Sequence, residues 1–168
     1  MELAWLQPNY DCWEEHPEVL HPYSLAAVYG GFFAVSKLVK SGKLNDCSVN
    51  AEKMADTVKM FIIQSALHKG VFVKHVATPN TQKAAKPLLN SGVDSSLIAL
   101  TLPYNVFSLD DPRVKATIAE IEKDLHYPQG GYYRYKGDVY YGGGEWILLT
   151  AWMGWYYASI GEVEKAGA

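Results

Sequence analysis

Two kinds of segment alternate along the 168-residue chain. Residues 23–39 (YSLAAVYGGFFAVSKLV) are apolar or small at nearly every position. This pattern predicts a helix that is buried on all sides and begins near Pro22. Residues 51–69 instead place apolar side chains at three-and-four spacing and charged side chains elsewhere. They therefore predict an amphipathic helix on the surface, with Asn50 as its N-cap.

The same alternation continues towards the C-terminus. Asp94 is predicted to cap a short apolar run, SSLIALTLP, and Asp111-Pro112 then begins a second amphipathic helix. The last apolar stretch, EWILLTAWMGWYYASIG, is again apolar all round. Inner helices that are buried and outer helices that are amphipathic follow each other in an α/α barrel, so the pattern predicts an all-α fold of this kind. The alternative is an irregular helical domain.

The loops alternate as well. The loops leading into the buried helices, at residues 9–22, 69–93 and 127–144, are long and rich in polar and aromatic residues. They lie at the N-terminal ends of those helices, so we expect them to share one face of the molecule and to carry its function. Residues 71–76 and 132–135 predict short β segments within these loops.

Composition narrows the possible partners. The formal charge of −3 comes with no basic stripe, so a nucleic acid is not expected. Residues 146–160 are too short to cross a bilayer and the N-terminus lacks signal-peptide features, so no membrane partner is expected either.

Cys12 and Cys47 are predicted to be free thiols in a reducing, cytoplasmic environment. Aromatic residues make up 13% of the chain, and they would either bind sugar rings or cap the core.

The loop before the first buried helix holds a cluster of carboxylates, Asp11, Glu14 and Glu15, around Trp13. A carboxylate that is held against an indole and partly desolvated has a raised pKa, which suits a general acid. The alternative is a solvated acidic loop that interacts with the helix N-terminus.

The loop before the last buried helix holds a second cluster. Arg134 and Asp138 are placed to pair with each other and to bind hydroxyl groups, while the tyrosines and Trp146 are placed to stack on sugar faces. No lysine-containing phosphate motif follows the glycines, and Asp138 and Glu145 would repel phosphate. The alternative is a structural Arg–Asp pair in a tyrosine-rich turn.

Together the two clusters resemble glycoside hydrolase family 15, the glucoamylases and their bacterial and archaeal relatives. The family motif L-W-E-E is similar to residues 12–15, and the motif R-Y-x-x-D-x-Y-Y-x-G-x-x-W matches residues 134–146 without a gap. The resemblance implies part of an (α/α)6 barrel, with about five of twelve helices in a single domain spanning residues 1–168. It also implies an active site at the N-terminal ends of the inner helices.

The resemblance implies a role for Glu14 as the general acid. It further implies a substrate-binding set, which comprises Trp13, Glu15, Arg134, Tyr135, Asp138 and Trp146. Neither a bound metal nor an organic cofactor is implied. The implied substrate is an α-glucan or α-glucoside oligosaccharide, such as isomalto-oligosaccharide or trehalose, hydrolysed with inversion.

The resemblance also indicates what the chain lacks. Inverting hydrolysis needs a general base besides the acid, and the family's base lies in the loop before the last inner helix. No such loop follows residue 160, and Glu145 occupies a motif position that is not catalytic. We therefore expect a truncated part of a longer enzyme, inactive alone, whose site needs a second copy or a complementing chain. The alternative is a non-catalytic half-barrel that self-associates or binds sugar weakly.

Overall fold

The computed structural model describes residues 4–45, 49–79, 85–89 and 92–167. Most of its regular structure is helical. The α-helices are α1 (Pro22–Lys40), α2 (Ala51–Ser65), α3 (Pro112–Leu125), α4 (Ile147–Ser159) and the short α5 (Val163–Ala166). The other elements are the strands β1 (Leu67–His68) and β2 (Val71–Phe72) and the 3-10 helices η1 (Ala4–Leu6), η3 (Ser95–Leu100) and η4 (Tyr140–Gly142).

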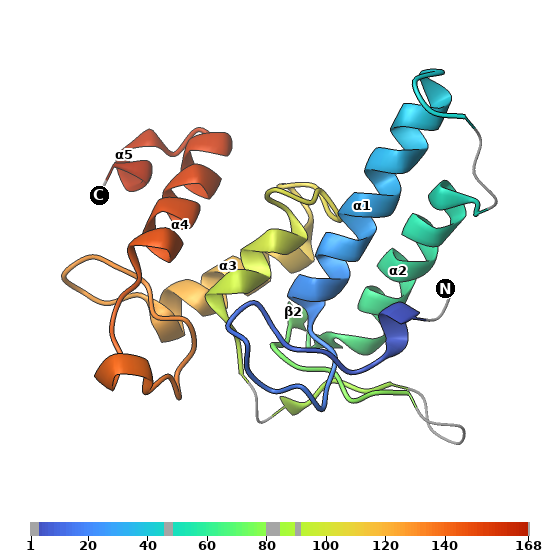
Figure 1. The fold of residues 1–168 in the computed structure, drawn as a ribbon. Coiled ribbons are helices and arrows are strands. Elements are labelled where there is room, and N and C mark those ends of the chain that lie inside the picture. The colour runs from blue at the N-terminus through green and yellow to red at the C-terminus, as the bar shows by residue number, and fades with distance from the viewer. Residues whose placement is uncertain (1–3, 46–48, 80–84, 90–91, 168) are drawn as a thin grey trace.

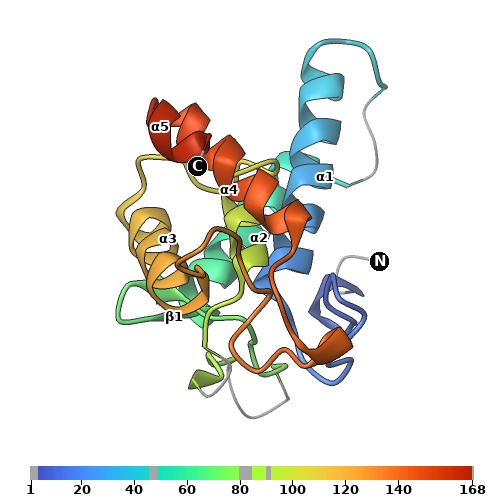
Figure 2. The ribbon, with the colours of Figure 1, turned by 90° about the vertical axis from the view of Figure 1, so that its left-hand side faces the viewer.

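The helices form an inner row and an outer row. η3 contacts both α1 and α4, so these three elements make the inner row. α2 packs against α1, α3 packs against η3 and α5 packs against α4, each from outside (Figures 1 and 2). This arrangement confirms the predicted alternation, and the chain is a partial all-α (α/α)6 barrel.

The helix starts follow the capping residues that the sequence contains. The Asn50 side chain accepts a hydrogen bond from the Lys53 amide, and the Asp111 side chain accepts one from the Arg113 amide. α1 and α3 each begin with a proline, which lacks the amide hydrogen that would be unsatisfied at this position. The predicted starts of the three longest helices are therefore confirmed.

Three predictions of local structure are corrected. The apolar run after Asp94 forms a six-residue 3-10 helix rather than an α-helix. The second helix ends at Ser65 because the chain enters the hairpin β1–β2, which turns at Gly70 with a positive φ of 83°. The β segments are shorter than predicted, since β2 has two residues and residues 132–135 contribute only isolated bridges.

The inner helices are not buried on all sides within this chain. α4 buries Leu149 and Met153, whereas Ile147 is 90% exposed and Leu148 is 60% exposed. The prediction of complete burial is wrong here because α4 has neighbours on one side of the row only. An exposed flank is what we expect of an open half-ring. No helix in the described ranges is long and apolar enough to cross a membrane.

Candidate functional site

The three long loops meet on one face, below the inner helices in Figure 1. Leu20 and Val76 exchange backbone hydrogen bonds of 2.9 Å, which join the first loop to the second. The Ser95 amide donates to the Arg134 carbonyl at 2.9 Å, which joins the third loop to the start of η3. The expectation that these loops share one face is thus confirmed.

Asp11 organises the acid loop, which we define as residues 11–16. Its Oδ1 accepts hydrogen bonds from the amides of Trp13 at 2.8 Å and Glu15 at 2.9 Å. Its carbonyl accepts a bond from the Glu14 amide at 3.2 Å. Glu14 and His16 have positive φ angles of 61° and 52°, a conformation that is uncommon for residues with side chains and is held here by the surrounding hydrogen bonds.

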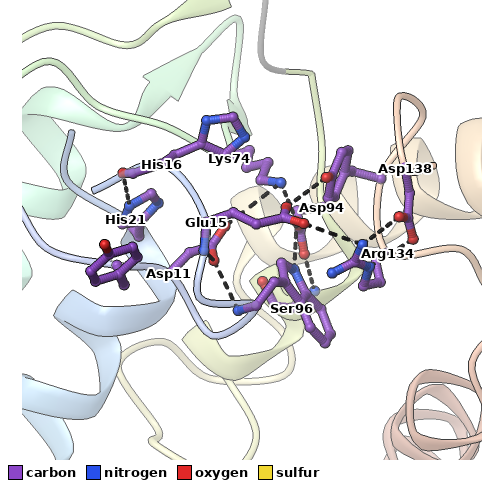
Figure 3. Close-up of polar contacts among 12 residues, drawn as sticks. Asp11, Glu15, His16, His21, Lys74, Asp94, Ser96, Arg134 and Asp138 are labelled. Carbon is purple, nitrogen blue, oxygen red and sulfur yellow. Dashed lines mark hydrogen bonds and ion pairs between the residues drawn. The ribbon is translucent and has the colours of Figure 1, made fainter. Parts of the chain in front are cut away.

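The three carboxylates of the acid loop have different environments. Asp11 is buried and holds the loop, as described above. Glu15 accepts a hydrogen bond from the Tyr135 hydroxyl at 2.6 Å and pairs with Arg134 at 3.3 Å (Figure 3). Glu14 is exposed, and its side chain makes no hydrogen bond or ion pair within the described ranges. The described residues therefore do not provide the desolvation expected for Glu14.

A buried lysine lies beneath the acid loop. Lys74 is only 4% exposed, and its Nζ lies 3.2 Å from Asp94 Oδ2 and 3.8 Å from Asp11 Oδ2. The ammonium also lies 3.1 Å from the centre of the Tyr135 ring, a cation–π contact. The Trp13 indole donates to Asp94 Oδ2 at 3.0 Å, so Asp94 binds both the lysine and the acid loop. Burial raises the pKa of Asp94, against the opposing influence of Lys74.

Sequence analysis did not find this support. It treated Asp94 only as a helix cap and assigned no role to Lys74. The sequence does contain a signal, because Lys74 interrupts the apolar run VFVKHV. A charged residue at the centre of such a run is seldom buried without a partner.

Arg134 and Asp138 form the predicted pair, and both side chains are buried. The Arg134 Nε donates to Asp138 Oδ2 at 2.6 Å, and Nη2 donates to Asp138 Oδ1, so the contact is bidentate. Hydrogen bonds from Arg134 hold the pKa of Asp138 below its usual range. Four aromatic rings surround the guanidinium at 5.1–5.4 Å, and they belong to Trp13, Tyr135, Tyr140 and Trp146.

Aromatic side chains line the open side of the site. The rings of Trp13 and Trp146 lie 5.8 Å apart, and Tyr141 beyond them is 91% exposed. A cavity of about 500 Å³ adjoins Trp13 between the starts of α1 and α4. Its lining includes Cys12, Tyr23, Trp152 and Trp155.

Burial raises the pKa of the Cys12 thiol to about 12, so this cysteine stays protonated, and Cys47 lies outside the described residues.

The structure thus brings six of the seven predicted site residues into one network. Trp13, Glu15, Arg134 and Tyr135 are connected directly, and Asp138 and Trp146 join them through Arg134. Glu14 belongs to the same loop, but its side chain joins none of these contacts among the described residues. A separate group of potential metal ligands, Asp11, His21 and His75, lies below the acid loop.

The inner and outer rows of helices, with the long loops at the N-terminal ends of the inner row, define the class of α/α-barrel proteins. The profile of glycosyl hydrolases family 15 matches residues 1–167. The chain belongs to this family.

Two curated relatives are similar over nearly the whole chain. An isomaltose glucohydrolase from Kribbella flavida is 37% identical over 162 residues, which are 96% of this chain and 38% of the relative. An uncharacterized glycosyl hydrolase from Methanocaldococcus jannaschii is 32% identical over 165 residues, which are 94% of this chain and 24% of that protein. The chain therefore spans well under half the length of these relatives.

Solved structures of glycosidases are similar to this chain as well. A glycosidase at 32% identity superposes with a TM-score of 0.82, covering 98% of this chain and 41% of its own. A variant of that glycosidase has been solved in complex with glucose, at the same TM-score. A bacterial glucoamylase in complex with acarbose is 20% identical and gives a TM-score of 0.66, which supports the fold alone.

Proposed function

We propose that this chain forms the acid half of the active site of a glycoside hydrolase that removes terminal glucose from α-glucosides. In this proposal Glu14 protonates the oxygen of the departing sugar. A carboxylic acid in this role contributes through general acid catalysis. The distinct states of the three neighbouring carboxylates are the observation that supports it most strongly.

Asp11 and Glu15 are both occupied by structural contacts, and Glu14 is not. The acid loop is fixed by two hydrogen bonds to Asp11, so the exposed Glu14 carboxylate is carried on a rigid support. A general acid needs both properties, because it has to be near the leaving oxygen and to exchange its proton in every turnover. The exposure leaves the Glu14 carboxylate accessible to a bound substrate.

The sugar contacts follow from the chemistry of the surrounding groups. In the proposal Arg134 and Glu15 bind hydroxyl groups of the glucosyl unit, while Asp138 and Tyr135 hold those two side chains in place. Trp13 and Trp146 provide apolar faces for the sugar ring. The similarity to an isomaltose glucohydrolase favours isomaltose or a related α-1,6-linked oligosaccharide as substrate.

The proposal needs a general base, which an inverting glycosidase places about 6.5–9.5 Å from the acid to leave room for water. We propose that this carboxylate comes from outside these 168 residues, in the same polypeptide or in another chain. Two solved structures of the similar glycosidase each carry a glutamate-to-alanine substitution. A pair of glutamates is in keeping with such a mechanism.

The test measures sugar binding and hydrolysis separately. Binding of isomaltose and glucose is followed by tryptophan fluorescence, and glucose release from isomaltose, maltose and trehalose is assayed alone and with a complementing fragment of the barrel. Glu14→Gln should bind sugar like the unmodified chain and abolish hydrolysis wherever hydrolysis occurs. Arg134→Ala should abolish binding. Hydrolysis that survives Glu14→Gln would refute the role of Glu14, and sugar binding that survives Arg134→Ala would refute the assigned sugar site.

The exposed flank of α4 favours a second function, self-association. Ile147, Leu148 and Trp155 are 90%, 60% and 46% exposed and lie on a helix whose other face is buried. Contiguous apolar surface of this kind favours association. Sedimentation should then show a dimer that Ile147→Ser and Leu148→Ser together weaken, and a monomer at all accessible concentrations would contradict this function.

A further inference from the structure

Three buried side chains from separate segments converge beneath the acid loop. They are Asp11 of that loop, His21 at the start of α1 and His75 of the second long loop. Each offers one potential ligand atom, and the three atoms lie within 4.8 Å of one another. The rings of His21 and His75 are in contact, with centroids 5.1 Å apart.

The hydrogen bonds of His21 fix its tautomer. Its Nε2 lies 2.9 Å from the Asn9 carbonyl and 3.1 Å from the His16 carbonyl, and both of these oxygens are acceptors only (Figure 3). Nε2 must therefore carry a hydrogen. Nδ1 is buried and has no hydrogen-bond partner among the described residues, so this tautomer leaves it with a lone pair.

This lone pair has no donor among the described residues. His21 Nδ1 and Asp11 Oδ2 are both fully buried, and neither has a hydrogen-bond partner among the described residues. Buried acceptors that lack a donor are unfavourable, and a cation bound by both residues would satisfy them. Lys74 forms an ion pair with Asp11 Oδ2 at 3.8 Å but donates no hydrogen bond to it, because its ammonium lies nearer to Asp94.

We propose that Asp11, His21 and His75 form a binding site for a divalent transition-metal ion such as Zn²⁺. Two imidazole nitrogens and one carboxylate are a ligand set typical of zinc and its neighbours, whereas Mg²⁺ and Ca²⁺ prefer oxygen ligands. Zinc–nitrogen bonds of about 2.1 Å place tetrahedral ligands about 3.4 Å apart, so side-chain adjustments of about 1 Å complete the site.

The ion would be structural. Asp11 Oδ1 already holds the amides of the acid loop, so a metal on Oδ2 would fasten that loop to α1 and to residues 74–76. The family resemblance implied no metal, and the three ligands, separated by 10 and 54 positions, match no motif spacing. The inference is independent of the proposed hydrolase function, since it concerns residues assigned no part in the chemistry.

The experiment measures metal binding directly. Untagged protein is stripped with a chelator, dialysed and titrated with zinc chloride by calorimetry, and the metal content before stripping is measured by mass spectrometry. We expect about one zinc ion per chain and a rise in Tm of about 5–10 °C at a zinc concentration a hundredfold above Kd. Absence of saturable zinc binding would overturn the proposal, as would equal stabilisation by calcium.

Matched variants assign the ligands. Asp11→Asn keeps an Oδ1 acceptor for the loop amides but removes the anionic Oδ2, and His75→Gln removes an imidazole. Each should weaken zinc binding at least tenfold, whereas His68→Gln, outside the cluster, should not change it. Unaltered binding in both ligand variants would place the zinc elsewhere and refute the site.

The neighbouring ammonium provides a test that a misfolded variant cannot imitate. Lys74 lies beside Asp11 and repels any cation bound there. Lys74→Met should therefore bind zinc about tenfold more tightly than the unmodified chain. Weaker zinc binding in a folded Lys74→Met variant, as judged by circular dichroism, would contradict a cation at this position.

Discussion

Replacement of Lys74 by methionine tests whether the buried charges hold the acid loop. Methionine keeps much of the length and apolar stem of lysine but removes the ammonium. The two carboxylates that it contacts, Asp94 and Asp11, are then buried without a cation. We expect the variant to fold less stably and to lose its order first at the acid loop, because Asp94 also anchors Trp13.

The size of the stability loss follows from the distances between the Lys74 ammonium and the two carboxylates. At an effective dielectric constant of about 20, charges 3.2 Å and 3.8 Å apart attract by about 5 and about 4 kcal/mol. The ammonium also lost several kcal/mol of hydration on burial, which offsets about half of this attraction. We therefore expect Lys74→Met to lower the free energy of unfolding by about 3–5 kcal/mol, the range typical of a broken buried ion pair.

The stability deficit of Lys74→Met should depend on pH through the pKa of Asp94. Burial raises the pKa of Asp94 above its unfolded value, and removal of Lys74 raises this pKa further. A group with a raised pKa stabilises the fold at low pH, and this contribution is lost as the pH rises through the folded pKa. The deficit of the variant should therefore be largest near neutral pH and shrink as the pH falls and Asp94 takes up a proton.

Urea unfolding in the presence of a chelator, at about pH 7 and about pH 5, measures both quantities. Lys115→Met is the control, because its pair with Asp110 is on the surface and is worth at most about 1 kcal/mol. A deficit for Lys74→Met no larger than that of the control would refute the reasoning. A deficit that grows on acidification would show that Asp94 is not the group responsible.

Two further predictions concern the arginine and the indole. Arg134→Lys should cost about 1–3 kcal/mol, because lysine cannot make the bidentate bond to Asp138. Because the pKa of Asp138 is lowered in the folded protein, its ionised carboxylate stabilises the fold above the unfolded pKa, and this stabilisation is lost as the pH falls through the folded pKa. The cost of Arg134→Lys should therefore shrink in acid. Thermal unfolding measured at several pH values checks both the cost and its pH dependence. Trp13→Phe removes the N–H donated to Asp94 and should cost about 1–2 kcal/mol more than Trp5→Phe, whose indole N–H has no partner among the described residues. Equal losses in the two tryptophan variants by urea unfolding would show that the indole hydrogen bond does not stabilise the fold.

Much of the fold was predictable because periodicity and capping are local. Apolar spacing identified α2 and α3, and Asn50 and Asp111 marked where they begin. The extent of burial was not predictable, because the flank of α4 is exposed or covered according to which neighbours are present. The 3-10 geometry of η3 was missed for a similar reason, since an apolar run too short to show a period fits several helix types.

The site was predictable where its residues lie close in sequence. Arg134 and Asp138 are four positions apart, and the pairing of their charges follows from that spacing. Lys74, by contrast, binds carboxylates 63 positions before it and 20 positions after it. No local pattern encodes such a contact, and only the meeting of three loops on one face creates it.

The open ring and the ordered acid loop are compatible because they depend on different contacts. The contacts that hold the acid loop and the adjoining carboxylates, from Asp11, Lys74, Asp94 and Tyr135, all lie within this chain. They are buried charges and short hydrogen bonds, which lose much of their strength if displaced by a fraction of their length. The exposed flank of α4 is held by apolar contacts on one side only, and its cover can come from any surface of matching shape. The backbone of the loop that carries Glu14 is therefore held locally, while the rest of the site depends on what completes the ring.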